Sequence, residues 1–158
     1  MTPRIETVGE RKLVGLRMTM SLSMNKTREL WQNFLRLRKE IKNQVGKDLY
    51  SIQLYDDLYF KTFSPHSTFE KLAAVEVTDF GEVPPGMEHF TMPSGMYAVF
   101  VHRGAAGAGP ATFNYIFSTW LPNSEYHLDN RPHFEVLGEK YKNDDPGSEE
   151  EIWIPVRK

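Results

Sequence analysis

Two stretches of the chain show the same order of predicted elements, a strand, a helix and two strands, offset by roughly 84 residues. They occupy about residues 1–82 and 87–158, and a short segment with Pro84, Pro85 and Gly86 joins them. Because this joint is too short to separate independent domains, we expect one domain over residues 1–158. The tandem β-α-β-β duplication predicts an α+β fold, with a curved antiparallel sheet, two helices on one face and a pocket on the pseudo-twofold axis.

The first half contains a period-two pattern followed by a helical pattern. Leu16, Met18 and Met20 alternate with polar residues and predict a strand over residues 12–22. Apolar residues then recur at spacings of three and four, which predicts a helix that Gly46 ends. The other predicted segments of this half are a strand over 50–55, a loop over 56–70 and a strand over 72–80.

The second half follows the same order. Pro110 suits the first turn of a helix, and the apolar stripe from Phe113 to Leu121 predicts that helix up to Pro122. The acidic residues Asp144, Asp145 and Glu149–Glu151 are interpreted as a solvated turn. Strands are predicted over 88–92, 95–102, 133–139 and 152–156.

Composition and charge exclude several classes of function. Hydrophobic residues make up 40% of the 158 residues and charged residues 25%, which is typical of globular proteins. The formal charge of −2 and the scattered Lys and Arg residues do not indicate nucleic-acid binding. No apolar run reaches the length of about 20 residues that a membrane helix needs. We therefore expect a cytoplasmic protein that binds neither nucleic acid nor membrane directly.

No cofactor or metal site is expected from the motifs. The chain has no cysteine, and its five histidines show no metal-ligand spacing. The Gly-rich segment 104–109 lacks the Gly-Lys-Ser or Gly-Lys-Thr ending of a phosphate-binding loop, and no Gly-X-Ser-X-Gly motif is present. These absences favour a binding domain without a metal or cofactor.

Three segments in the second half resemble the gyrase-inhibitor-like small-molecule-binding family, the bacterial transcription-activator effector-binding domain. They are residues 120–126 (WLPNSEY), 131–135 (RPHFE) and 152–156 (IWIPV). The resemblance extends over the whole chain, since the family is itself a tandem duplication, and implies a stand-alone member without a helix-turn-helix module. Where relatives often carry a tyrosine after the Phe-Glu pair, this chain has Val136-Leu137-Gly138.

The resemblance points to Glu135 as the acidic contact of a lipophilic, cationic ligand. Burying an ionised carboxylate in mid-strand without a partner costs roughly several kcal/mol of folding free energy. Such a carboxylate therefore needs a cation, a proton or contact with water. The alternative from the alternation alone is that Glu135 faces solvent while Phe134 and Val136 point inward.

Aromatic side chains are candidates for the walls around Glu135, because ring faces attract cations and bury apolar scaffolds. The alternative for each is ordinary core packing. The candidates are Trp31, Tyr55, Phe90, Tyr97, Trp120, Tyr126 and Trp153.

Three functions are compatible with this family resemblance. The first is binding of lipophilic cations, for sequestration or sensing. The second is hydrolysis of reactive, cyclopropane-bearing toxins, with Glu135 and a tyrosine such as Tyr97 or Tyr126 as catalytic residues. The third is modulation of a protein partner, DNA gyrase or a transcription regulator. We expect binding rather than catalysis, and the sequence defines neither the ligand nor the oligomeric state.

Overall fold

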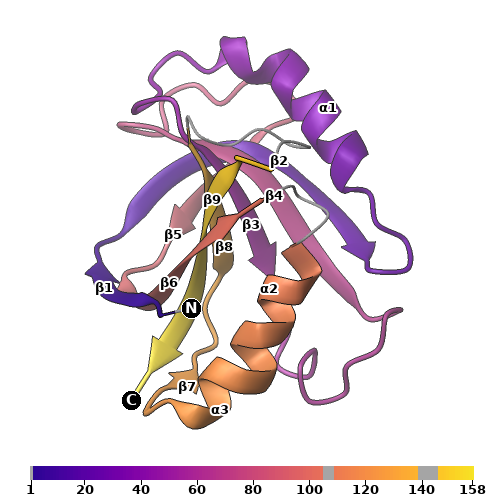
Figure 1. The fold of residues 1–158 in the computed structure, drawn as a ribbon. Coiled ribbons are helices and arrows are strands. Elements are labelled where there is room, and N and C mark those ends of the chain that lie inside the picture. Colours follow the sequence, from indigo (N-terminus) through magenta and orange to yellow (C-terminus); the bar gives the residue numbers. More distant parts are fainter. Residues whose placement is uncertain (1, 105–108, 139–145) are drawn as a thin grey trace.

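The computed structural model describes residues 2–104, 109–138 and 146–158 (Figure 1). The first half contains β1 (Arg4–Val8), β2 (Arg11–Ser21), α1 (Thr27–Leu37), a 3-10 helix (Arg38–Glu40), β3 (Leu49–Leu54) and β4 (Thr68–Glu76). The second half contains β5 (Glu88–Met92), β6 (Gly95–Arg103), α2 (Gly109–Tyr115), a π-helix (Ile116–Trp120), α3 (Leu121–Asn123), β7 (His127–Leu128), β8 (His133–Leu137) and β9 (Glu149–Arg157).

The predicted α+β fold and its internal duplication are confirmed. The strands form a curved, antiparallel nine-stranded sheet in the order β1-β6-β9-β8-β3-β4-β2-β5, with β7 paired to β9. This order reads as the same series of elements from either end, so a pseudo-twofold axis passes between the central strands β3 and β8. The starting residues of β5, β6 and β8 lie 84 positions after those of β1, β2 and β3.

Each half gives a strand to the other half. The strand β1, which the sequence did not predict, pairs with β6 of the second half, and β5 pairs with β2 of the first half. The central pair β3 and β8 also joins the halves. The repeat is therefore a sequence unit whose hydrogen bonds extend across the whole sheet.

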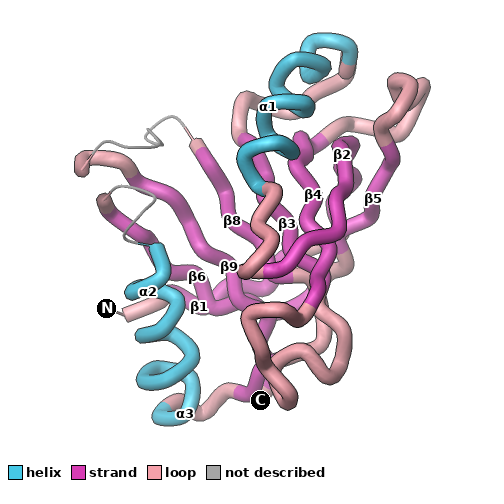
Figure 2. The backbone as a smooth tube through the Cα atoms, turned by 90° about the vertical axis from the view of Figure 1, so that its right-hand side faces the viewer, coloured by secondary structure: helices cyan, strands magenta, loops and turns pink. Residues whose placement is uncertain are grey.

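The helix α1 and the continuous helix formed by α2, the π-helix and α3 cover the same face of the sheet (Figure 2). Residues paired directly across antiparallel strands share a face, and one such row runs Leu16, Ala73, Ser51, Glu135, Ile152, Phe100. Leu30 and Phe34 of α1 pack near the first end of this row, and Ile116 packs against its other end. Figure 2 shows α1 and α2 apart from each other, each beside its own strands. Ser51 and Glu135 lie between the two helical layers.

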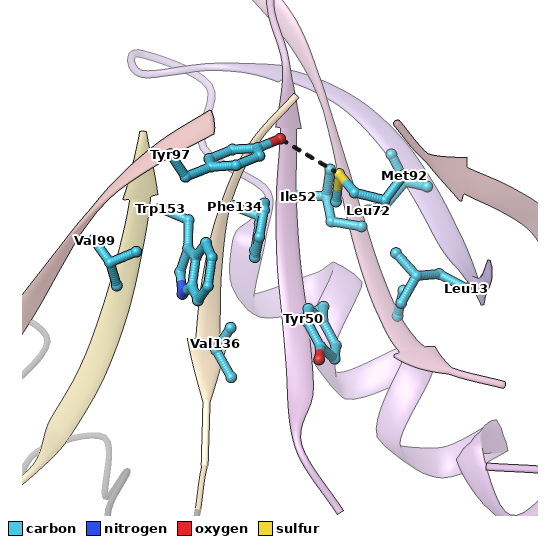
Figure 3. Close-up of a cluster of buried hydrophobic side chains, with 11 residues drawn as sticks. Leu13, Tyr50, Ile52, Leu72, Met92, Tyr97, Val99, Phe134, Val136 and Trp153 are labelled. Atoms are coloured by element: carbon cyan, nitrogen blue, oxygen red, sulfur yellow. Dashed lines mark hydrogen bonds between the residues drawn. The ribbon is translucent and has the colours of Figure 1, made fainter. Parts of the chain in front are cut away.

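The opposite face is covered by a core of buried apolar and aromatic side chains. Tyr97, Phe134 and Trp153 pack against one another there, and the Tyr97 hydroxyl lies 3.9 Å from the Met92 sulfur (Figure 3). The sheet curls around this core, because β5 and β6 are far apart in the strand order and yet follow one another directly in the chain. Side chains on this face are separated from the helical face by the sheet itself.

The first helix is shorter than the sequence predicted. It ends at Leu37 with one turn of 3-10 helix, and Gly46 lies in the loop that follows. Residues 41–46 are not helical because their backbone bonds to the end of β4: Val45 N–H donates to the Glu76 carbonyl. Ile41 still reaches the core beneath α1, so an apolar residue in a loop imitated helical spacing.

The second helix does not end at Pro122, contrary to the prediction. It continues through a π-turn, in which Leu121 N–H donates to the Ile116 carbonyl, into α3 up to Asn123. In a regular helix a proline ring clashes with the carbonyl four residues earlier. For Pro122 that carbonyl belongs to Ser118, which lies in the π-turn, and the wider backbone of this turn accommodates the ring. Pro122 therefore sits in the first turn of α3.

Strand boundaries also differ from the predictions at two places. The strand β4 begins at Thr68, inside the predicted loop. Glu149, Glu150 and Glu151 belong to β9 and not to a solvated turn, while Asp144, Asp145 and Glu139 lie outside the described residues. In the described part of the chain, no helix has the length and apolar character needed to cross a bilayer.

Candidate functional site

Glu135 lies beside the pseudo-twofold axis of the sheet. Its partner in the register of β3 and β8 is Ser51, which is also its counterpart 84 positions earlier. The pseudo-twofold axis thus passes between a serine and a glutamate on the helical face. Neighbouring Phe134 and Val136 point into the opposite core, as alternation requires. Glu135 is partly buried between the two helical layers rather than fully exposed to solvent.

Polar groups from three neighbouring strands surround the Glu135 carboxyl. Gln53 on β3 donates through Nε2 to Glu135 Oε1 over 3.3 Å. Glu150 on β9 shares a side-chain hydrogen bond with Glu135, and the Lys71 ammonium on β4 interacts with both carboxyls. Lys71 also donates to Thr27 Oγ1 at the start of α1, over 3.2 Å. Glu135 and Glu150 together form an acidic pair.

The surroundings oppose ionisation of this cluster. Burial raises the pKa of Glu135, while Lys71 favours the carboxylate. Burial and the adjacent Glu135 carboxylate raise the pKa of Glu150 to about 8. Burial lowers the pKa of Lys71, an effect that Glu135 and Glu150 oppose. Burial thus raises the pKa of both carboxyls, and their proximity favours a proton on the acidic pair.

An aromatic wall adjoins the acidic pair, formed by Tyr55, Phe60, Phe117 and His133. Phe60, from the segment between β3 and β4, stacks on Phe117 of the π-helix at 5.3 Å and on His133 at 5.5 Å. Tyr55 meets His133 edge-on at 4.9 Å. The wall joins the two halves of the molecule on the helical face, and Phe60 remains 40% exposed.

Of the predicted aromatic residues, Tyr55 is the one that belongs to the aromatic wall, and it also interacts electrostatically with Glu135. Burial raises the pKa of the Tyr55 hydroxyl, and the Tyr59 and Glu135 charges add to this effect. Trp120 and Tyr126 also lie on the helical side, in the layer under α2, where their rings stack at 6.2 Å. Trp31 lies in the layer under α1, edge-on to Phe34.

Tyr97, Phe90 and Trp153 lie on the opposite face from Glu135. Tyr97 has no exposed surface and donates a hydrogen bond to the Pro132 carbonyl, and Trp153 stacks on Phe134 at 5.1 Å. Phe90 packs at the border of the same core. Burial raises the pKa of Tyr97 to about 12, so this hydroxyl stays protonated in the core.

Sequence reasoning missed Glu150, Lys71 and Gln53, and with them Phe60, Phe117 and His133 of the aromatic wall. Glu150 was grouped with the acidic turn, although it has the same parity as Ile152 and Ile154 along β9. That parity is the signal that places it on the helical face. Lys71 and Gln53 carried no such signal, because their approach to Glu135 depends on the register of β3 with β4 and β8.

A surface hollow of about 320 Å³ lies at the edge of the site. Its lining residues are Thr19, Leu54, Tyr55, Asp56, Thr68, Phe69 and Glu70. Tyr55 belongs to both the hollow and the aromatic wall, but Glu135 does not line the hollow. The site is thus defined by its charged and aromatic groups, not by this hollow. In the described ranges, no group of three or more potential His, Asp or Glu ligands is arranged to hold a metal ion.

Comparison with known proteins gives relatives and structural neighbours. The chain is 28% identical to the transcriptional regulator BrlR of Pseudomonas aeruginosa over 130 residues, which cover 81% of this chain and 45% of the regulator. The chain thus spans less than half the length of this relative.

Two solved structures illustrate the similarity of fold. SAV2435 bound to tetraphenylphosphonium has a TM-score of 0.76 at 16% identity, covering 99% of this chain and 94% of that one. EcmrR, solved in a DNA complex, has a TM-score of 0.72 at 19% identity, covering 99% of this chain and 57% of EcmrR. The model of the GyrI-like small molecule binding domain matches residues 1–157, and the chain belongs to this family.

Proposed function

We propose that the protein binds lipophilic monocations on the helical face of its sheet, between the acidic pair and the aromatic wall. The observation that carries this proposal is the position of Glu135, a partly buried carboxyl on the pseudo-twofold axis whose direct protein donors are the neutral amide of Gln53 and the Glu150 carboxyl. Lys71 favours this carboxylate electrostatically but donates its hydrogen bond to Thr27, so a cation placed directly against Glu135 adds to the attraction.

The aromatic wall supplies the second part of the recognition. Ring faces attract cations by about 0.5–2 kcal/mol each and also bury apolar groups. Phe60 and Phe117 come from opposite halves and stack on each other, so a ligand that packs against this pair contacts both halves at once. A structural neighbour was solved with tetraphenylphosphonium, a cation surrounded by phenyl groups, which supports this ligand chemistry.

Hydrolysis receives less support than binding. A catalytic tyrosine has to lie near the carboxyl that activates water, and Tyr97 lies on the opposite face in the core. Tyr126 stacks on Trp120 in the layer under α2. Tyr55 interacts electrostatically with Glu135, but burial holds its proton firmly. Similarity to a transcriptional regulator favours sensing of the bound cation over sequestration alone.

Calorimetric titration with two ligands of similar shape tests the proposal. Methyltriphenylphosphonium carries one fixed positive charge, and triphenylphosphine oxide is neutral. We expect the wild type to bind the cation at least tenfold more tightly, about 1.4 kcal/mol. Glu135→Gln should bind the two ligands about equally, because the amide removes the charge and retains the shape.

Glu151→Gln is the matched control. Glu151 neighbours Glu150 on β9 but points to the other face, where it accepts a hydrogen bond from Arg4 at 2.8 Å. This variant should keep the wild-type preference for the cation. Equal binding of both ligands by the wild type, or an unchanged preference in Glu135→Gln, contradicts the proposal.

A further inference from the structure

The acidic pair and Lys71 form a cluster with two carboxyls and one ammonium. Glu135 and Glu150 lie on the same face of the paired strands β8 and β9, at diagonal positions, so their carboxyls can share a hydrogen bond if the pair carries one proton. With Glu150 protonated, Glu135 ionised and Lys71 charged, the three side chains sum to zero charge. A cluster of this composition has no room for an added positive charge unless it gives one up.

Most of the other groups around the cluster are uncharged. Ser51 and Gln53 on β3 are neutral, and Tyr55 keeps its proton. His133 on β8 is buried and neutral, since burial lowers its pKa to about 3. His102 on β6 bonds Thr112 of α2 at 2.7 Å and favours the Glu135 carboxylate. Thr27 of α1 accepts from Lys71.

We propose that Glu150 determines the charge of the ligand, because a monocation that binds beside Glu135 replaces the one proton that the acidic pair holds. This inference rests on the proposed function. On binding, the O–H bond of Glu150 breaks and its proton leaves to water or buffer. Two carboxylates, the Lys71 ammonium and the monocation then sum to zero, as the cluster did before. A dication leaves one uncompensated positive charge, and a neutral ligand leaves the proton in place.

Proton exchange makes the affinity depend on pH. The pKa of Glu150, raised to about 8, means that the pair holds its proton at neutral pH. Below that value protons compete with the cation, so affinity should rise about tenfold for each pH unit between 6 and 7 and level off above 8. The neutral ligand should bind equally well over the same range.

Calorimetry in buffers of different ionisation enthalpy counts the protons directly. Methyltriphenylphosphonium has no titratable group, so every proton released comes from the protein. For the wild type we expect close to one proton released per cation at pH 7 and a smaller fraction as the pH rises above about 8. Triphenylphosphine oxide should release almost none. This measurement needs no variant and therefore does not depend on the folding of one.

Glu150→Gln tests the assignment to this residue. The amide can still donate to the Glu135 carboxylate but carries no acidic proton, so release should fall below about 0.2 per cation and affinity should become nearly independent of pH. Glu151→Gln should release as many protons as the wild type.

The outcomes separate this inference from the proposed function. Cation binding by the wild type without proton release, or with undiminished release in Glu150→Gln, overturns the inference and leaves the proposed function intact. If the wild type binds neither ligand between pH 6 and 9, both are overturned. Release of a proton with the cation, absent from Glu150→Gln, supports both.

Discussion

At the scale of single residues, burial in the centre of the sheet keeps the imidazole of His133 neutral. Its ring is 7% exposed and lies among Tyr55, Phe60 and Phe117. Burial lowers its pKa to about 3, with the charge of Arg131 adding to the effect. The imidazole therefore acts as a neutral aromatic residue of the wall, and protonating it in the folded protein is unfavourable.

His133 should make the protein less stable in acid. The unfolded chain binds a proton at this imidazole below about pH 6.5, whereas the folded protein does not until about pH 3, so stability is lost as pH falls through this window. We expect His133→Phe to remove this loss. The free energy of unfolding of the variant, relative to wild type, should rise by about 2 kcal/mol from pH 7 to pH 5.

Urea denaturation at several pH values measures this difference. Titration of the acidic pair is common to both proteins and cancels in the comparison. His127→Phe, at an exposed position on β7, controls for the replacement of an imidazole by a phenyl ring. Parallel stability curves for wild type and His133→Phe are incompatible with a buried, neutral His133.

At the scale of elements, alternation predicted most strands and the resemblance pointed to Glu135, but the approach of Gln53 and Lys71 to Glu135 was not predictable. The segment Glu149–Glu151 has the composition of a solvated turn, and only its pairing with β6 and β8 makes it a strand. Ile41 imitated helical spacing from a loop. Hydrogen bonds to a distant strand fix both segments, residues 43–45 to the end of β4 and Glu149–Glu151 to β6 and β8, and local sequence carries no record of those partners.

The segment between β3 and β4 carries Phe60, the most exposed ring of the aromatic wall. Phe60 stacks there on Phe117 and His133. Because the ring buries the phenyl groups of either ligand, Phe60→Ala should weaken the cation and the neutral ligand alike, by about 3- to 30-fold. The same titrations measure this effect. Phe63 is the control, because its ring is 51% exposed and packs against Tyr59 rather than on the wall.

Phe63→Ala should change both affinities by less than about twofold, since a largely exposed side chain contributes little. If Phe60→Ala weakens the cation alone, the ring acts only through its charge distribution. If it weakens neither ligand, Phe60 is not part of the binding site.

At the scale of the whole molecule, the duplication joins the two halves rather than separating them. The first strand of each half pairs with a strand of the other half. The central pair β3 and β8 brings residues from both halves to the Glu135 site. The aromatic wall adds a contact between Phe60 of the first half and Phe117 of the second. Neither half has a complete sheet without the other, so we propose that the chain folds as one cooperative unit.

The three tryptophans allow this cooperativity to be tested. Trp31 reports on α1 in the first half, and Trp153 reports on the core face of β9 in the second. We expect urea unfolding followed by fluorescence to coincide with unfolding followed by far-UV circular dichroism in two variants, one retaining only Trp31 and one retaining only Trp153, because a two-state transition looks the same to every probe. Each variant is compared with its own dichroism, so a stability change caused by Trp→Phe does not affect the comparison. Separate midpoints for Trp31 fluorescence and dichroism, or a plateau between two transitions, indicate that the halves unfold independently despite the exchanged strands.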